Sequence, residues 1–393
     1  MIPRNIAHIL KQYSEWFPVV SVTGPRQSGK STLVQEIFSN YDYVNLELPG
    51  ERAAANNDPL GYIRSHPAPL IIDEAQLAPE LFNVIQVESD RVGTPGQYIL
   101  SGSQNFILKR QISQSLAGRV GMLTLLPLSY QELCVDRDEI SFDDFLHRGG
   151  YPRLYNVQIP EDVYYSNYVT TYLDRDVSGL INASSLSQFN LFLRIAAGNI
   201  GQLVNITSMA SDVGVSVKTL RAWLSILEQS YIIFPLQPYF SNSRKRMVKT
   251  PKIYFFDTGL LCYLLSSKSV LEMERSGTLG PVFENAVISE RYKSYLNLGK
   301  SPELYFYRDS NGCEVDLVDM TDATKPLLYE IKSARTYRNS FMRHLDSVGK
   351  FLEVDPERRA VVMRYDHTTE VNGSKIWNVE DWLRADNRLP YNG

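Results

Sequence analysis

The first third of the chain alternates short apolar runs with longer segments of mixed polarity. The runs are FPVVSVTG (17–24), YVNLEL (43–48), APLIIDE (68–74), QYILSGS (97–103) and MLTLLPLS (122–129). The segments between them are long enough for helices, and strands that alternate with helices form parallel sheets. We therefore predict an α/β domain with a parallel sheet over residues 1–135.

The middle of the chain has a different apolar spacing. Residues 136–195 have mostly helical periodicity and contain the sharp turn RGGYPRLY (148–155). Residues 196–265 contain two helical segments with a turn at Gly214, followed by two short strands. This order is typical of a winged helix-turn-helix. We predict a helical subdomain over 136–195 and a winged helix over 196–265.

The last third of the chain mixes one long helical segment with strands. A helical stretch (281–296) is followed by the strand LYFYR (304–308) and by two apolar strands around a turn (314–332). The pattern predicts a C-terminal α+β domain over residues 270–393.

Composition is that of an ordinary globular protein. The chain has 393 residues, 44% of them hydrophobic and 21% charged, so two to four domains are expected. The net charge of −4 gives no overall attraction to nucleic acid or membrane, and any basic surface must be local.

Cysteine usage and the N-terminal segment indicate a reducing compartment. The three cysteines, Cys134, Cys262 and Cys313, are far apart in sequence, which argues against disulfides and a zinc cluster. Arg4 and Lys11 interrupt the N-terminal segment before any long apolar run forms. We therefore predict a cytoplasmic protein that does not engage membranes.

A phosphate-binding loop follows the first apolar run. The segment GPRQSGKS fits the G-x-x-x-x-G-K-[ST] pattern at Gly24, Gly29, Lys30 and Ser31. Its main-chain N–H groups and the N-terminus of the following helix would donate hydrogen bonds to phosphate oxygens. Lys30 would add a positive charge, and Ser31 would bind Mg²⁺. We predict an ATP site that also includes Thr32.

Polar residues end the next two apolar runs of this domain. Asp73 would hold Mg²⁺ and Glu74 would polarise the attacking water, which favours hydrolysis over passive nucleotide binding. Ser103, Gln104 or Asn105 could orient that water, and we favour the first two. Arg119 precedes the last strand, where it could stabilise transition-state charge, although a helix-end or surface arginine is the alternative.

These motifs resemble those of a known family. GPRQSGKSTL, PLIIDEAQ, ILSGSQ, SLAGRV and LPLSYQEL resemble the AAA+-type ATPases of a prokaryotic family whose C-terminal domain is poorly characterised. The resemblance continues through RGGYPRLY, YLDRDV and KIYFFDTGL to FENAVISERYK, YFYRD, GCEVDLV and YEIKSA. It implies an AAA+ or RecA-like P-loop sheet domain, a helical subdomain, a winged helix and a restriction-endonuclease-like α+β domain. In AAA+ proteins an arginine before the last core strand acts across a subunit interface, which implies a homo-oligomer and a role in trans for Arg119.

A basic segment lies where a winged helix would place its wing. The segment SRKRMVKTPK contains the densest positive cluster of the chain, Arg244, Lys245, Arg246, Lys249 and Lys252. Such residues would contact DNA phosphates without reading sequence. The candidate recognition helix offers only Lys218, Thr219 and Arg221 for groove contacts, and a protein-binding or solvated surface remains the alternative.

The C-terminal hairpin carries several acidic residues. Glu314 and Asp316 share one face of the first strand, and Glu330 and Lys332 share one face of the second. A pairing centred on Ala323 would place Asp316 opposite Glu330. Opposed carboxylates repel each other, so such a pair is either hydrated or holds a cation.

The same residues resemble the PD-(D/E)xK nuclease pattern. Asp316, Glu330 and Lys332 stand at its motif positions, and Glu284 on the preceding helix could complete the metal sphere. Asp316, Glu330 and the carbonyl of Ile331 would bind Mg²⁺ while Lys332 orients the attacking water. The alternative is a charged hairpin on a fold retained for binding. Glu314 and Asp319 are bystanders in this interpretation.

Two hypotheses follow for function. The first is an ATP-hydrolysing protein that engages DNA and controls a Mg²⁺-dependent nuclease domain. The second is a nucleotide-gated switch or scaffold that holds a protein partner without cleavage. A helicase is disfavoured because no second motor core is visible. The substrate, partner and pathway do not follow from the sequence.

Overall fold

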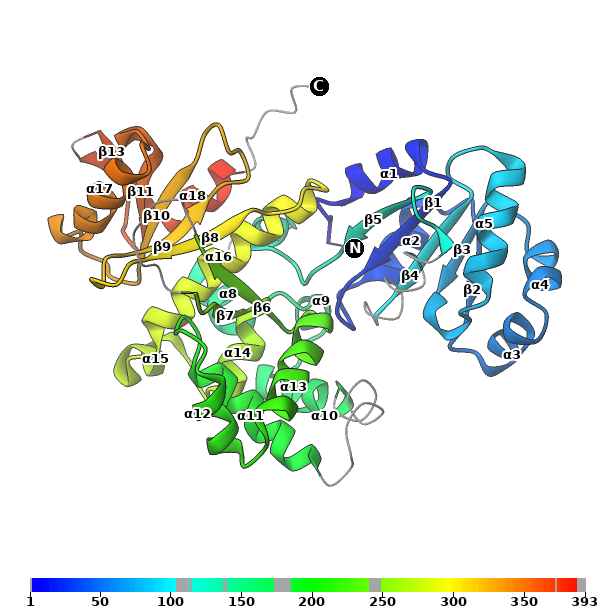
Figure 1. The fold of residues 1–393 in the computed structure, drawn as a ribbon, viewed down its shortest axis with the longest axis horizontal. Helices are drawn as coiled ribbons and strands as arrows, with labels where there is room; N and C mark the ends of the chain where they lie inside the picture. The colour runs from blue at the N-terminus through cyan, green and yellow to red at the C-terminus, as the bar shows by residue number, and fades with distance from the viewer. Residues whose placement is uncertain are drawn as a thin grey trace.

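The computed structural model describes residues 2–103, 112, 115–136, 140–172, 185–239, 249–371 and 373–386. Figure 1 shows an N-terminal sheet domain, a helical region below it in the view, and a C-terminal sheet on the opposite side. The yellow helix α16 (Leu279–Asn297) lies between these parts.

The N-terminal sheet is parallel, as the apolar runs predict. Its strands are β1 (Val19–Thr23), β2 (Asp42–Asn45), β3 (Leu70–Asp73), β4 (Tyr98–Gly102) and β5 (Val120–Thr124). Their order is β2-β3-β4-β1-β5, and each pair of neighbours is parallel. The helices around it are α1 (Ala7–Trp16), α2 (Lys30–Ile37), α3 (Pro49–Asn57), α4 (Pro59–Ser65) and α5 (Leu81–Val92).

The three central strands of this sheet, β1, β3 and β4, are buried on both faces. Val19 packs into one apolar cluster, whereas Val20 and Val22 pack into another, because alternate side chains of a strand point to opposite faces. A sheet covered on both faces needs continuous apolar strands, which explains why the runs carry no polar alternation. The carboxyl ends of β1, β3 and β4 therefore meet at one edge of a rigid platform.

A helical region follows the sheet. Its helices are α7 (Tyr130–Asp136), α8 (Phe142–Arg148), α9 (Pro152–Asn156), α10 (Glu161–Tyr172), α11 (Leu186–Gly198), α12 (Ile206–Val213), α13 (Val217–Gln229), α14 (Thr258–Leu264) and α15 (Val270–Ser276). The predicted turn lies between α12 and α13, where Gly214 has φ +78°. The side chains of Asn205 and Ser216 cap the two helices.

The C-terminal sheet includes strands from the segment predicted as a winged helix. Its strands are β6 (Ile233–Pro238), β7 (Lys252–Phe255), β8 (Leu304–Arg308), β9 (Glu314–Asp319), β10 (Leu327–Lys332), β11 (Arg359–Met363), β12 (Thr369–Val371) and β13 (Ser374–Asn378). In the described residues the order is β12-β13-β11-β10-β9-β8-β6-β7. The structure differs here from the predicted boundary near residue 265, because β6 pairs in parallel with β8 and extends one continuous sheet.

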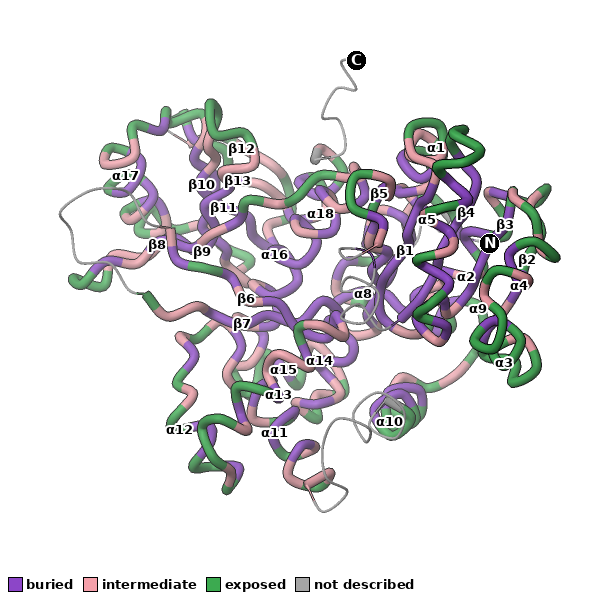
Figure 2. The backbone as a smooth tube through the Cα atoms, turned by 45° about the vertical axis from the view of Figure 1, so that its right-hand side comes forward, coloured by how far each residue is buried: buried purple, intermediate pink, exposed green. Residues whose placement is uncertain are grey.

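Helix α16 is buried on nearly all sides, and the tube in Figure 2 is mostly purple along it. It packs against β5, β7 and β10 and against α8, α14 and α18 (Val379–Asp386). A second helix, α17 (Met342–Phe351), covers the sheet at β9, β10 and β11. One apolar core joins the helical region to the C-terminal sheet, so these parts form a single packed body.

Candidate nucleotide site and C-terminal acidic cluster

The phosphate loop connects β1 to α2 and needs both of its glycines. Gly24 has φ +151°, and a Cβ atom there would lie 2.0 Å from the carbonyl oxygen of Leu125. Gly29 has φ +94° and immediately precedes α2. Only glycine adopts these conformations readily, so the loop geometry depends on the residue types that define the motif.

Lys30 lies in the loop with its ammonium group against main-chain oxygens. Its Nζ donates to the carbonyls of Gly24 (3.0 Å) and Pro25 (2.8 Å), and the residue is buried. Ser31 and Thr32 follow in the first turn of α2 and line the adjacent cavity. The structure thus brings together all five predicted loop residues at the N-terminus of a helix, which favours anions.

Arg4 braces this loop from outside the motif. Its guanidinium donates to the carbonyls of Ser28 (2.8 Å) and Leu126 (2.6 Å) and to Glu132 Oε1 (3.1 Å). The side chains of Arg4 and Glu132 are 4% and 1% exposed. Sequence reasoning missed Arg4, because its three partners lie between 24 and 128 residues away in the chain.

Asp73 and Glu74 end β3 beside the loop. Ser101 Oγ donates to Asp73 Oδ1 (2.5 Å), and Tyr43 Oη donates to Asp73 Oδ2 (2.8 Å). Ser103 Oγ lies 3.3 Å from Glu74 Oε2, so the predicted polar residue after β4 does meet the predicted general base. Gln104 and Asn105 lie outside the described residues. Ser101 was missed, since it lies within an apolar run.

A cavity of about 780 Å³ opens between the loop and the helical region. One wall holds predicted site residues, Gly29, Lys30, Ser31, Thr32, Asp73 and Glu74. The opposite wall comes from α9 and α10 and includes Arg153 and Tyr168. Tyr164 Oη also donates to the loop residue Gln27 (2.8 Å). The volume suits a nucleotide, and Arg153 is a candidate phosphate contact that sequence reasoning did not identify.

Arg119 lies away from this cavity. It precedes Val120, which pairs with Val19 at the start of β1, whereas the loop follows the end of β1. Arg119 Nε donates to Asp90 Oδ1 (2.6 Å) and a second guanidinium nitrogen donates to Asp90 Oδ2 (2.9 Å). Arg119 therefore cannot serve the nucleotide site of its own chain, and any contact with phosphate would be with that of a second copy.

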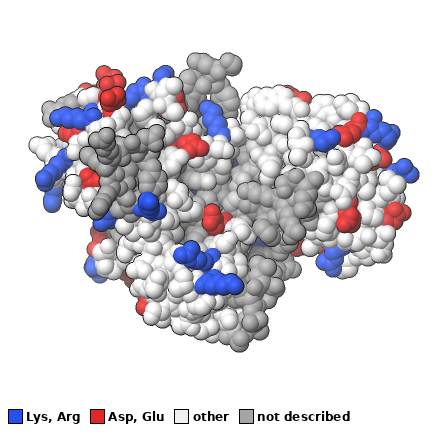
Figure 3. Space-filling view, viewed as in Figure 1, with Lys and Arg blue, Asp and Glu red and all other residues white. Residues whose placement is uncertain are grey.

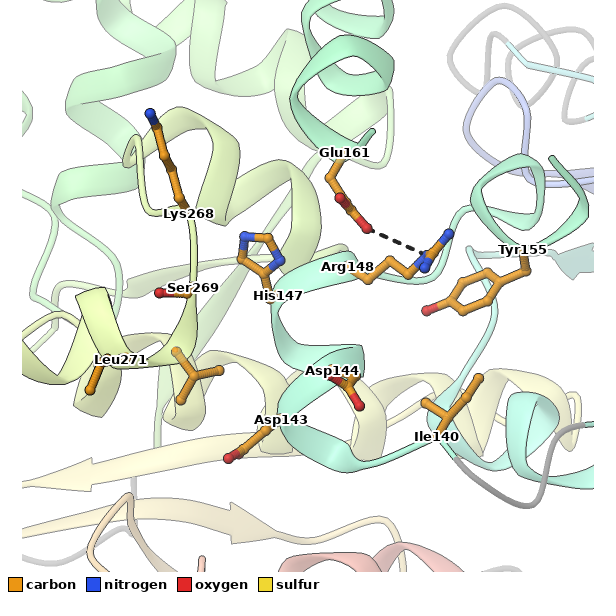
Figure 4. Close-up of a pocket in the computed structure, with 11 residues that line it drawn as sticks. Ile140, Asp143, Asp144, His147, Arg148, Tyr155, Glu161, Lys268, Ser269 and Leu271 are labelled. Atoms are coloured by element: carbon orange, nitrogen blue, oxygen red, sulfur yellow. Dashed lines mark ion pairs between the residues drawn. The ribbon is translucent and has the colours of Figure 1, made fainter. Parts of the chain in front are cut away.

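A second cavity, of about 510 Å³, lies beside α8 in the helical region. Figure 4 shows Arg148 extending toward Tyr155 and forming an ion pair with Glu161. In the same view His147 lies between this ion pair and Lys268. Positively charged, negatively charged and apolar side chains all line this second cavity. Helix α9 separates the two cavities, since Tyr155 lines this one and Arg153 lines the nucleotide cavity.

The C-terminal hairpin has the register that the sequence predicts. Leu327, Leu328 and Tyr329 pair with Asp319, Val318 and Leu317, so the pairing is centred on residue 323. This register brings Lys332 Nζ to 2.6 Å from Glu330 Oε1 and 3.3 Å from Asp316 Oδ2. The main-chain N–H of Ile331 also donates to Asp316 Oδ2 (2.7 Å).

Glu284 joins this cluster from α16. Burial, and then repulsion from Asp316, raise the pKa of Glu284 to about 6. The same two causes raise the pKa of Glu330 to about 8. Burial is the larger cause of both pKa shifts, and repulsion from Asp316 adds to it.

Lys252 and Glu314 were misplaced by the sequence interpretation. Lys252 was expected on a DNA-facing wing, but its side chain is 3% exposed and lies 2.6 Å from Glu314 Oε1 and 3.3 Å from Glu284 Oε1. The pairing of β7 with β6 turns this lysine into the protein. Glu314 is therefore a member of the acidic cluster and not a bystander, whereas Asp319 is a bystander that pairs with Arg291.

The acidic cluster has the donors that Mg²⁺ prefers, but lysines lie among them. Its donors are carboxylate oxygens, and Glu330 Oε2 is buried with no hydrogen-bond partner. Lys332 lies between Asp316 and Glu330. As the side chains stand, the described residues include no group of three or more His, Cys, Asp or Glu arranged to hold a metal ion.

The rest of the predicted DNA surface is only partly described. Arg244, Lys245 and Arg246 lie outside the described residues. Lys249 is exposed, as are Lys218 and Arg221 on α13, while Thr219 is half-buried and contacts the capping Ser216. On the face shown in Figure 3, positive and negative side chains both occur over the C-terminal sheet.

Comparison with protein families defines the class. Residues 17–134 match a model described as an AAA domain, residues 139–270 a domain of unknown function (DUF8612), and residues 279–382 a domain of unknown function (DUF4143). Together with the loop and strand order above, the first match assigns residues 17–134 to an AAA-type P-loop domain. No described helix has the length and apolar character needed to cross a membrane.

Relatives extend over nearly the whole chain. It is 31% identical over 368 residues to "Uncharacterized protein Rv2008c" of Mycobacterium tuberculosis (strain ATCC 25618 / H37Rv), covering 93% of this chain and 80% of that protein. The values are the same for "Uncharacterized protein Mb2031c" of Mycobacterium bovis. The chain therefore belongs to the family of these mycobacterial proteins. An uncharacterized protein of Haemophilus influenzae is 22% identical, with 98% of each chain covered.

Solved structures are more distant. The Walker-type ATPase of Pyrococcus abyssi is 14% identical with a TM-score of 0.46, covering 66% of this chain and 94% of that chain. AMPPCP-bound DnaA from Aquifex aeolicus is 11% identical with a TM-score of 0.30, covering 57% of this chain and 86% of that chain. At these scores neither structure places a residue of the site.

Proposed function

We propose that this protein binds ATP with Mg²⁺ in the 780 Å³ cavity and hydrolyses it. The observation that carries the proposal is the convergence of Lys30, Asp73 and Glu74 on one cavity at the carboxyl edge of a parallel sheet. These are the charged groups that phosphoryl transfer to water requires, a cation for the phosphates, a metal-binding carboxylate and a water-activating carboxylate.

Each charged or polar residue on the loop side of the cavity has a role in this proposal. Lys30 exchanges its two main-chain acceptors for phosphate oxygens. Ser31 and Asp73 would hold Mg²⁺, which when bound neutralises charge on the phosphates. Glu74 orients and deprotonates the attacking water, and Ser103 Oγ fixes the carboxylate of Glu74 by a hydrogen bond. Arg153 would contact the phosphates from the α9 wall.

The test uses two variants of residues that line the nucleotide cavity and two matched control variants. Lys30→Ala should abolish nucleotide binding, because it removes the ammonium group that the loop itself offers to the phosphates. Glu74→Gln should bind ATP normally and lose at least about 100-fold in turnover, since removing a general base costs 10²–10⁴-fold. The controls Lys11→Ala and Glu80→Gln change exposed side chains of the same domain. ATP turnover that survives Lys30→Ala or Glu74→Gln would refute the assignment.

We propose as a second function that the C-terminal cluster is a divalent-cation site for DNA cleavage. The observation that favours it is the approach of Asp316, Glu330 and Lys332 to one another, with a buried carboxylate oxygen of Glu330 left without a partner. Asp316, Glu330 and the Ile331 carbonyl would hold Mg²⁺, which would polarise a phosphodiester. Lys332 Nζ would orient the attacking water. Glu284 would complete the oxygen set.

The rival function is a nucleotide-gated switch that holds a protein partner. To separate the two, plasmid and single-stranded DNA are incubated with the protein and Mg²⁺ or Mn²⁺, with and without ATP. Cleavage that disappears in Asp316→Ala and Lys332→Ala supports the nuclease. Cleavage that survives Asp316→Ala excludes this site, and an absence of cleavage under every condition favours the switch.

A further inference from the structure

The acidic cluster already contains a cation supplied by the chain. Lys252 projects from β7, and its ammonium lies between Glu314 (2.6 Å) and Glu284 (3.3 Å). Tyr254, two residues later on the same face of β7, donates from Oη to the same Glu284 oxygen (2.5 Å). The ammonium also lies over the Phe306 ring, with Nζ 5.3 Å from the ring centre, at cation–π distance.

We propose that Lys252 is the resident counter-ion of this cluster, and that a divalent cation occupies the cluster only when the Lys252 ammonium leaves Glu284 and Glu314. This proposal rests on the C-terminal cation site proposed above and states what controls the entry of a cation into that site. It also adds two residues to that site, Lys252 as the competitor and Glu314, whose Oε1 the departing lysine would free while Oε2 stays paired with Arg308 Nη1 (3.2 Å).

Electrostatics favours competition over coexistence. A partly buried carboxylate is costly without a positive partner. Glu314 keeps Arg308 Nη1 (3.2 Å) when Lys252 leaves, whereas Glu284 then needs another cation. An ammonium and a divalent cation within a few ångströms of each other would repel each other in this partly buried site, where screening by water is reduced. Lys332 neutralises the other half of the cluster, yet Glu330 Oε2 remains unpartnered, so the cluster retains capacity for more positive charge.

The position of Lys252 in the sheet allows it to move. Among the described strands β7 lies at the end of the sheet and pairs along its length only with β6. One further bridge joins Lys252 to Leu203. A displacement of β7 would break this ladder together with the main-chain bonds from Gly201 and Val204 to the carbonyls of Ile253 and Pro251, whereas Asp316 and Glu330 lie on strands with a full ladder on each side.

The test measures Mn²⁺ affinity of the full-length protein without nucleotide, by calorimetry and by the Mn²⁺ electron paramagnetic resonance signal. Lys252→Met keeps the length of the side chain and removes its charge. We expect it to bind Mn²⁺ at least tenfold more tightly than the wild type. Lys325→Met, on the exposed hairpin turn, is the matched control and should bind as the wild type does. Asp316→Ala, built into Lys252→Met, should abolish the gain.

The outcomes separate the two proposals. If Lys252→Met binds Mn²⁺ no more tightly than the wild type, and Asp316→Ala abolishes binding, the cation site stands and the competition is overturned. If neither the wild type nor Lys252→Met binds Mn²⁺, both proposals fail. Should Lys252→Met be unfolded without metal, Mn²⁺ must restore its near-ultraviolet circular dichroism, and failure to do so also overturns the competition.

Discussion

Replacing Arg4 with alanine would test whether the phosphate loop depends on a brace outside its motif. Arg4 is buried and joins Ser28 in the loop, Leu126 after β5 and Glu132 on α7. The substitution leaves two carbonyl oxygens and one carboxylate without their charged donor. It therefore affects both the stability of the domain and the shape of the loop.

The magnitude follows from the contacts that remain. Breaking a buried ion pair by removing one partner costs about 3–5 kcal/mol. Glu132 keeps the main-chain N–H groups of Asn5 (2.8 Å) and Ser129 (2.9 Å), so we expect the lower end, about 3 kcal/mol. The loss of one charge-assisted bond to the loop, about 1.5 kcal/mol, should weaken nucleotide binding roughly tenfold.

The assay combines urea unfolding with titration of a fluorescent ATP analogue. Arg4→Lys should recover part of the affinity, because an ammonium can reach one acceptor but not all three. Arg64→Ala, an exposed arginine of the same domain, is the control and should change neither quantity. If Arg4→Ala loses stability but keeps wild-type affinity for the analogue, the brace is structural only and the reasoning about the loop is wrong.

Three further predictions concern the N-terminal domain and the helix α10 that contacts its phosphate loop. Gly24→Ala places a Cβ atom 2.0 Å from a main-chain oxygen and should abolish binding of the ATP analogue, whereas Gly50→Ala, with nothing within 4 Å, should bind normally. Tyr164→Phe removes the hydrogen bond to Gln27 and should raise the dissociation constant about threefold to tenfold in the same titration, as expected for one hydrogen bond. Arg119→Ala should lower kcat at least about 100-fold without weakening ATP binding if the arginine acts on a second copy; an unchanged kcat would identify it as the surface partner of Asp90.

Local patterns were sufficient for the N-terminal sheet and for the hairpin. The apolar runs and the glycine pattern are determined by neighbouring residues, so β1, the loop and α2 could be located from a short stretch of sequence. The register centred on residue 323 follows from turn position and side-chain alternation alone.

Long-range pairing explains what the sequence could not predict. Lys252 belongs to a basic segment by composition, but the pairing of β7 with β6 turns its side chain inward, beside Glu314 from a strand some 60 residues later. Arg153 lines the nucleotide cavity and Arg4 bonds to the phosphate loop, each from a separate part of the chain. No local pattern contains such partners, because they are brought together only when the sheets and helices pack.

Helix α16 contacts both the segment after β5, near the phosphate loop, and the C-terminal acidic cluster. The N–H of Tyr130 donates to Glu290 Oε2 (2.8 Å), and Lys293 Nζ lies 3.3 Å from the Leu128 carbonyl and 2.7 Å from Glu290 Oε1. Leu128 and Tyr130 follow β5, whose end contacts the phosphate loop through Gly24 and through Arg4.

Because these polar groups are buried, separating α16 from the segment after β5 would leave them unpaired at about 1–3 kcal/mol each. A shift of that segment therefore costs less free energy when α16 moves with it. Glu284 lies six residues before Glu290, about 9 Å along the same rigid helix. The strand that carries Lys252 is tied to the same helix, because Asn285 of α16 bonds to both the N–H (2.7 Å) and the carbonyl (2.9 Å) of Phe255, so Glu284 and Lys252 move together when α16 moves.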